Sequence, residues 1–548
     1  MRSRSNWALA APAPIRFNQP HSGLFLNSKR AVLQFTIQIL ILHMIAHAST
    51  KSSQAAELPA AAHAVINALP KKTLTLDYVL KESMRSADSF RALNSARQSF
   101  TSEELKNKSI TETYFKLSAS KLNNQNEALS TFSTNRTIST AATLSAESYF
   151  RSGTALLAEV KYGKTELYYP ATLVSATDTK YFDTEISLTL KQNIWKDFFG
   201  FATRKSIAAG EASTQIKTLE FFENRESWFF DIHKIYSDVW LMQQRSKAAE
   251  SNLGRRKRLS KITTIRAERG TAEKPDLYQS ESAVQESNTA VLESNQGLGS
   301  MWRSLIITLG LPSEWESIDP NVIPVEYLPP IDRALELCGS ESAVADPPLE
   351  SVSTLKIQFQ SQAARYQYEA SKNRLNPDLN LQFNYTVNGL DTANVSDAIS
   401  DTTGRKFPSW LAGIELKIPL NNFESKSQFE VASSQLERAE AMLGQSHAAL
   451  VVNWKNECHN LFRLKKSIDL RKSSYENQRL RAELEEKRYR LGRVGLTNVI
   501  QAGDDASRSE LSLRESQSEI DRSSWKILQY SNQINTYLDR IQEELSRQ

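Results

Sequence analysis

The residues best suited to metal binding or nucleophilic catalysis are few in this chain and lie far apart. The two cysteines are Cys338 and Cys458, and His459 follows the second. A structural zinc site needs about four ligands, and consecutive helical residues such as Cys458 and His459 point in different directions. We therefore predict no metal site. Two cysteines are also too few for a disulfide framework, as expected of an exported protein that does not rely on disulfides.

No residue pattern of an enzyme stands out elsewhere. His63, His233 and His447 are isolated, and there is no glycine-rich phosphate loop, Ser/His/Asp set or paired-carboxylate signature. The net charge of +5 is small for 548 residues, so no nucleic-acid partner is implied. We expect no catalytic residue and no cofactor.

Polar residues do recur at matching positions after two glycines. The segments GTAEKPDLYQS, from Gly270, and GRVGLTNVIQA, from Gly492, align without a gap. Asp276 and Gln279 in the first correspond to Asn498 and Gln501 in the second. Glycine permits a backbone turn that other residues resist, so each segment predicts a turn between two helices.

Matching elements surround the two turns. In each half an alternating segment precedes a charged, proline-free helical stretch of about seventy residues, long enough to span roughly 105 to 110 Å. After each turn a shorter helix runs back. The expected strands are 182–192 and 410–420, the long helices begin near Trp195 and Phe423, the returning helices are 276–309 and 498–538, and the opening helices are 74–106 and 349–373. This duplication argues for an elongated object rather than a globular enzyme.

The N-terminus predicts export. Lys29 and Arg30 precede an apolar run over 31–45, which ends at Ala46-His47-Ala48. A positive flank, a short apolar core and an A-x-A site form a secretory signal peptide, here residues 1–48, followed by a tail over 49–72. The alternative is an anchor helix, but the run is short for a membrane span of about twenty residues. Ser49 is not a cysteine, so no lipid anchor is expected.

The strands resemble lipid-facing strands of a membrane barrel. In residues 378–388 one face is apolar and the other is polar, as expected of a transmembrane β-strand; the apolar face holds Leu379, Leu381, Phe383, Tyr385 and Val387. Residues 113–122, 182–192 and 410–420 alternate similarly. Strands of a soluble sandwich alternate in the same way. Four strands, however, can neither enclose such helices nor close a barrel, which needs about eight, so we expect a barrel shared between protomers.

The chain divides into two repeats. The first covers 73–311 and the second 349–541, with a proline-bearing connector over 312–348, a short helix at 331–338, and a C-terminal tail over 542–548. The first repeat has an insert at about 123–179, in which 137–150 and 154–164 suggest a hairpin around Arg151-Ser152-Gly153. The hairpin either projects outside the cell or adds strands to the barrel, and the sequence leaves both open.

Three segments resemble the TolC family of outer-membrane efflux proteins: LTLDYVLKESMRSADSFRALNSA from Leu74, LKIPLNNF from Leu416 and RYRLGRVGLTNVIQA from Arg488. The first-half junction LKQNIW departs from the pattern, with Asn193 in place of Pro419. The resemblance implies an α+β membrane protein that forms a homotrimer. Three protomers share a twelve-stranded β-barrel in outer-membrane lipid, four strands from each, and a periplasmic α-helical coiled-coil barrel.

The resemblance also implies a function and a location. Family members are passive export ducts for drugs, metals or secreted polypeptides in tripartite efflux pumps or type I secretion systems. They work with a periplasmic adaptor and an inner-membrane transporter, bind no cofactor and hydrolyse nothing. The location is the outer membrane of a Gram-negative bacterium, with the helices in the periplasm.

The family narrows its channel at the helix tips with aspartate, tyrosine and arginine side chains. By position, the resemblance implies gate residues in this chain: Asp276, Gln279, Tyr489, Arg493, Asn498 and Gln501, with turns at Gly270 and Gly492. Asp276 also fits a plain helix-start carboxylate favoured by the helix dipole. The nearby basic run over 255–258 suits either an adaptor or membrane contact or, in the favoured interpretation, a solvated helix face.

The rival class is a structural protein, a periplasmic or surface coiled-coil scaffold whose strands pack against one another. Extraction only by detergent, as a trimer, would favour the duct, and a soluble monomer would eliminate it.

Overall fold

The computed structural model describes residues 69, 72–125, 133–169, 179–348 and 351–547. The predicted signal peptide over 1–48 and almost all of the tail over 49–72 lie outside these residues, as do parts of the insert. No helix among the described residues is long and apolar enough to cross a membrane.

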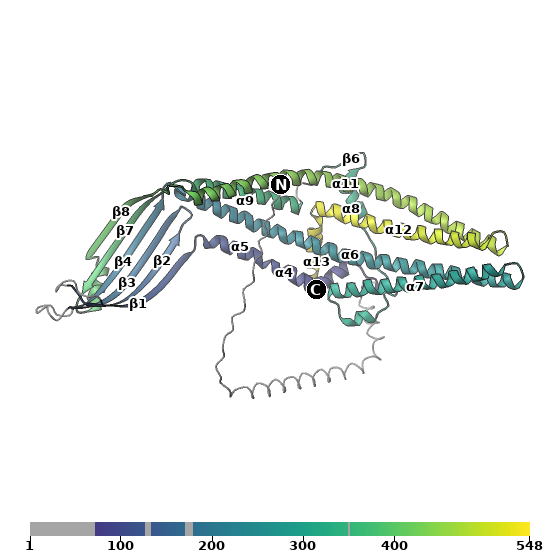
Figure 1. Ribbon diagram of the computed structural model, residues 1–548, viewed down its shortest axis with the longest axis horizontal. Coiled ribbons are helices and arrows are strands. Elements are labelled where there is room, and N and C mark those ends of the chain that lie inside the picture. The colour runs from purple at the N-terminus through teal and green to yellow at the C-terminus, as the bar shows by residue number, and fades with distance from the viewer. Residues whose placement is uncertain (1–68, 70–71, 126–132, 170–178, 349–350, 548) are drawn as a thin grey trace, which may run out of the picture. The chain divides into compact units, whose positions relative to one another are not determined.

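Six antiparallel strands form one sheet in the order β1-β2-β3-β4-β7-β8 (Figure 1). They are β1 (Thr113–Gln125), β2 (Arg136–Tyr149), β3 (Thr154–Tyr168), β4 (Thr179–Asn193), β7 (Asp378–Asp391) and β8 (Phe407–Lys417). All four predicted strands are confirmed to within a few residues. The predicted hairpin of the insert is β2 and β3, inside the sheet. The sheet of one protomer therefore has six strands, two more than the four that the resemblance implied.

One face of the sheet is apolar across neighbouring strands. Directly opposed residues of antiparallel strands lie on the same face. One such row crosses five strands and consists of Leu117, Leu144, Val160, Ile186 and Val387. One residue further along, a polar row consists of Ser118, Thr143, Lys161, Glu185 and Asn388. Short helix α10 (Val395–Thr403), between β7 and β8, packs against β4 through Thr184, whose hydroxyl donates to Ala398 O at 2.8 Å.

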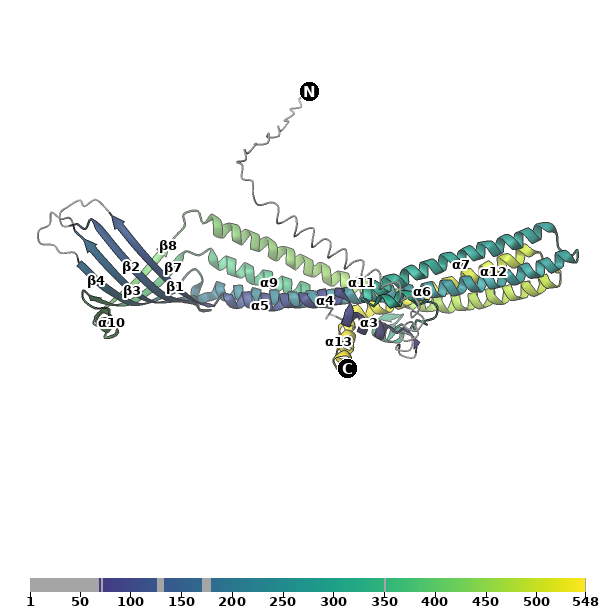
Figure 2. The ribbon, with the colours of Figure 1, turned by 90° about the horizontal axis from the view of Figure 1, so that it is seen from below.

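Two helices of 68 residues each, α6 (Phe201–Glu268) and α11 (Phe423–Arg490), extend from the sheet. At about 1.5 Å per residue each is roughly 100 Å long. The helices α7 (Lys274–Leu309) and α12 (Leu496–Tyr530) run back beside them from turns at the end opposite the sheet (Figure 2). The start of α11 is as predicted. However, α6 begins later than Trp195, because Asp197 and Phe199 have positive φ and interrupt the helix around the short turn η2 (Phe198–Gly200).

Shorter helices fill the length between the sheet and the middle of the long ones. α9 (Val352–Arg374) packs along both α6 and α11. The predicted opening helix 74–106 is instead three helices, α3 (Leu76–Ser86), α4 (Asp88–Ala96) and α5 (Gln98–Ser109), with an extended residue at Ala87. The predicted helix 498–538 is also broken: Asn532 has φ 56° and separates α12 from α13 (Gln533–Ser546).

The connector is tied to the second repeat by a disulfide. Its helix α8 (Ile331–Cys338), found where predicted, precedes a two-stranded ribbon of β5 (Gly339–Ser340) and β6 (Ala343–Val344). α8 packs on α11 and α12, so that the Cα atoms of Cys338 and Cys458 are 5.6 Å apart and their sulfurs are bonded. The expectation that the protein does not rely on disulfides is therefore wrong. Disulfides persist in oxidising compartments, which agrees with export.

Candidate gate at the helix tips

The two helix tips have the same backbone design. Gly270 and Gly492 both have φ 72°. Thr271 N donates to Arg266 O at 2.8 Å, and Arg493 N donates to Arg488 O at 2.9 Å. A left-handed glycine with this bond from the following residue is the Schellman way to end a helix. The predicted turns thus lie at these two glycines.

A tyrosine joins the two tips. Tyr489, near the end of α11, is 1% exposed, and its hydroxyl lies 2.9 Å from Thr263 Oγ1 on α6. The Arg266 guanidinium lies over the Tyr489 ring, 4.4 Å from its centroid, and donates to Tyr489 O at 2.8 Å. A cation–π contact of this kind stabilises by about 0.5–2 kcal/mol. Tyr489 therefore links α11 to α6 within one protomer.

Apolar side chains pack beneath this polar contact. Leu259 of α6 meets Leu496 and Val499 of α12 and the Tyr489 ring in one buried cluster. Burial of this apolar area opposes separation of the two helical hairpins, α6–α7 and α11–α12. The ends of α6, α11 and α12 therefore form one packed group.

The remaining gate candidates lie around this group. Asp276 is half-buried in the first turn of α7, where the helix dipole favours a carboxylate. Gln279 Nε2 donates to Thr497 Oγ1 at 3.4 Å and so meets the first turn of α12. Arg493, Asn498 and Gln501 are exposed. A single protomer brings Gln279 and Tyr489 to the opposite hairpin, and the roles of all six residues at a gate stay a prediction.

The basic run over 255–258 is only partly a solvated face. Arg255 Nη2 donates to Ser507 Oγ on α12 at 2.5 Å, and Arg256 forms an ion pair with Asp504 on the same helix. Lys257 and Arg258 are exposed, as the favoured interpretation expected. The prediction of a solvated face is therefore wrong for Arg255 and Arg256, because the sequence does not show which side of α6 faces α12.

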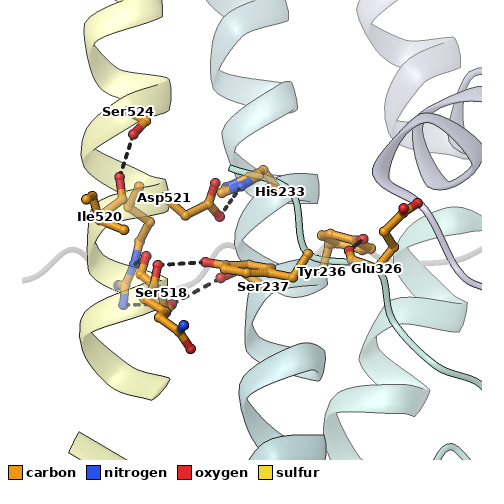
Figure 3. A network of polar contacts seen from close by, with 11 residues as sticks. His233, Tyr236, Ser237, Glu326, Ser518, Ile520, Asp521 and Ser524 are labelled. Atoms are coloured by element: carbon orange, nitrogen blue, oxygen red, sulfur yellow. Dashed lines mark hydrogen bonds and ion pairs between the residues drawn. The ribbon is translucent and has the colours of Figure 1, made fainter. Parts of the chain in front are cut away.

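A second polar contact joins α6 and α12 further from the tips (Figure 3). His233 Nε2 lies 2.9 Å from Asp521 Oδ2, and both side chains are 3% exposed. Below them Ser237 Oγ lies 3.1 Å from Ser518 Oγ. Sequence reasoning treated His233 as isolated, because its partner is 288 positions away. These contacts align the two hairpins along their length.

Among the residues that the structure describes, no group of three or more His, Cys, Asp or Glu side chains is arranged to hold a metal ion. The polar side chains at the tip bind other parts of the same protomer.

Several outer-membrane channels are among the solved structures that match this fold. The outer-membrane channel OprN matches with TM-score 0.60 and 14% identity over 83% of this chain and 89% of that one. VceC from Vibrio cholerae matches with TM-score 0.59 and 12% identity, covering 83% and 95%. CmeC from Campylobacter jejuni matches with TM-score 0.57 and 12% identity, covering 83% and 85%. The protein therefore has the fold of an outer-membrane channel.

Residues 352–533 match the family model described as outer membrane efflux protein. Curated protein sequences contain no significant match to the chain. The predicted resemblance to the TolC family of outer-membrane efflux proteins is confirmed, and with it the α+β fold and the class of outer-membrane export duct. The protein is located in the outer membrane of a Gram-negative bacterium, with its helices in the periplasm, and it is a channel component rather than an enzyme.

Proposed function

We propose that three copies of this chain form a passive exit duct, which serves a tripartite efflux pump or a type I secretion system. The observation that carries the proposal is the continuity of one chain from an apolar-faced sheet into helices of 68 residues. An apolar face suits lipid, and roughly 100 Å of helix suits a passage through the periplasm. Trimerisation supplies the further strands and helices that one protomer lacks.

The partners are a periplasmic adaptor and an inner-membrane transporter. The helix tips are the part of the protomer furthest from the sheet (Figure 2), so they are where an adaptor meets the duct. Tyr278 and Leu491 are exposed there, at 67% and 68%, and offer apolar contact area. Solutes enter between the three sets of tips, where Asp276, Asn498 and Gln501 form the narrowest ring.

The test is reconstitution of the full chain. Membranes are extracted with and without detergent, the mass of the purified complex is measured, and its conductance is recorded in planar bilayers. If the proposal is right, the protein leaves the membrane only when detergent is present, the purified complex has the mass of three chains, and it conducts ions. A soluble monomer without conductance would refute the duct and leave the coiled-coil scaffold.

A further inference from the structure

The inserted hairpin is built into the wall of the sheet. β2 pairs with β1 along 13 residues and with β3 along 14, and β3 pairs with β4 along a further 14. The hairpin therefore separates β1 from β4 instead of standing outside them (Figure 1). Its strands are as long as their neighbours, so they continue the sheet over its full height.

The turn of the hairpin is seated on the junction between sheet and helix. A Cβ atom at Gly153 would lie 2.7 Å from Gly200 N, and one at Gly200 would lie 2.0 Å from Arg151 O. Only glycine permits so close an approach. Tyr149 OH donates to Asp197 Oδ2 at 3.1 Å, and Asp197 Oδ1 accepts from Thr203 N at 2.9 Å. The hairpin is thereby fixed to the start of α6.

The hairpin also continues both faces of the sheet. Leu144 and Val160 belong to the apolar row and are 49% and 50% exposed, like Ile186 on β4, which is 41% exposed. On the opposite face Lys161 forms an ion pair with Asp183 of β4 at 3.4 Å. A hairpin outside the membrane would need no such apolar face, whereas a strand between lipid and a wet lumen does.

The two outer strands, β1 and β8, are left without neighbours on one side. Every residue of β1 is exposed, including Phe115 at 76% and Leu117 at 78%, and on β8 Trp410 and Ile414 are 71% and 72% exposed. With six strands in strict antiparallel order, β1 and β8 run in opposite directions. Hence β8 of one copy can pair antiparallel with β1 of the next, and unpaired edges are abolished on closure.

We propose that three copies close an eighteen-stranded barrel, in which each protomer supplies six strands and the β2–β3 hairpin forms a third of the wall. The proposal rests on the trimer of the proposed function. Because barrel diameter grows nearly in proportion to strand number, this lumen is about 1.5 times as wide as that of a twelve-stranded barrel. The outer-membrane section thus passes bulkier solutes.

The test places single cysteines on β3 and attaches a fluorophore. The native cysteines do not interfere, because both are in the disulfide. Val160→Cys is compared with Lys161→Cys, its neighbour on the polar face, and with Ile186→Cys, directly opposite on β4. The labelled trimer is placed in vesicles containing doxyl-labelled phosphatidylcholine. If Val160→Cys fails to assemble, Ala158→Cys, paired with Leu188→Cys, replaces it.

We expect quenching at Val160 to equal that at Ile186 and to exceed that at Lys161. Weak quenching at Val160 with strong quenching at Ile186, in a complex of three chains, would overturn the eighteen-stranded barrel but not the proposed function. Weak quenching at Ile186 as well, or a mass other than three chains, would overturn the proposed function. Electron cryomicroscopy of the unlabelled trimer in nanodiscs gives the strand count directly, and twelve strands would contradict the inference.

Discussion

At the scale of single residues, the contact of Tyr489 with Thr263 and Arg266 is the best-defined link between the two helical hairpins, α6–α7 and α11–α12. We expect Tyr489→Phe to remove the hydrogen bond to Thr263 while keeping the ring beneath Arg266. Losing such a bond costs about 0.5–1.5 kcal/mol and leaves the buried Thr263 hydroxyl with one partner fewer. The tips then separate more easily, which raises the mean single-channel conductance. Tyr278→Phe, at an exposed ring, is the control and leaves conductance unchanged.

Gly492 gives a prediction about stability. At φ 72° a β-branched residue costs about 1–3 kcal/mol, so Gly492→Val lowers the yield of folded trimer. The control is Gly495→Val three residues on, where φ is −75° and a Cβ meets nothing within 4 Å. Equal trimer yields for the two variants would contradict this account of the turn.

Glu226 makes stability depend on pH. The carboxylate accepts from Asn535 Nδ2 at 2.7 Å and from Gln529 Nε2 at 3.1 Å, but burial raises its pKa to about 7. The unfolded chain releases this proton near pH 4.5, so the stabilising contribution is complete below that pH and is lost as pH rises through 7. The free energy of unfolding therefore decreases by about 3 kcal/mol per protomer over this range. We expect the melting temperature to fall between pH 5 and 8, and Glu226→Gln to flatten that fall.

The measurement is thermal loss of the trimer at each pH. Glu515→Gln, at an exposed carboxylate, is the matched control and keeps the pH dependence of the unmodified protein. A Glu226→Gln profile parallel to that of the unmodified protein would rule out Glu226 as its source.

At the scale of elements, the orientation of β7 is open to a direct test. Leu381 and Phe383 are on the apolar face, opposite Ile414 and Ala412 of β8, and Gln382 is on the polar face between them. Arginine at either apolar position costs about 2–4 kcal/mol near the middle of the bilayer, whereas a lumen position stays wet. We expect Leu381→Arg and Phe383→Arg to lower trimer yield in outer membranes far more than Gln382→Arg. Equal yields would contradict the assigned faces.

The sequence predicted the elements that depend on a local residue pattern. It did not predict the features that depend on contacts with distant parts of the chain. Strict alternation located β7, and a glycine between two helical stretches located each tip. The break at Asn532 and the extended residue at Ala87 have no matching signal in a helical pattern. Pairing across long separations was also invisible, as for His233 with Asp521 and for the two cysteines. The gate residues stay a prediction for a different reason, because a ring on an axis exists only when three chains meet.

At the scale of the whole molecule, the charge of the entrance predicts its response to cations. Asn498 and Gln501 carry no formal charge, so three copies leave Asp276 as the source of negative charge at the ring. We expect weak block by a multivalent cation added on the periplasmic side, and stronger block for Asn498→Asp, most visibly at low salt where screening is poor. Gln517→Asp, on the same helix away from the tip, is the control. Tight block that survives Asp276→Asn would exclude these residues from the gate.

The bond between Cys338 and Cys458 sets an order of events in biogenesis. The chain crosses the inner membrane from its N-terminus, so the first thiol emerges while the second, 120 positions later, is still inside the cell. Oxidation to the native pair must wait until the first half of α11, up to Cys458, has been translocated. The bond therefore forms only after export has reached the middle of the second repeat. A chain that has not reached that point has a free thiol at Cys338, and its connector is not yet bonded to α11.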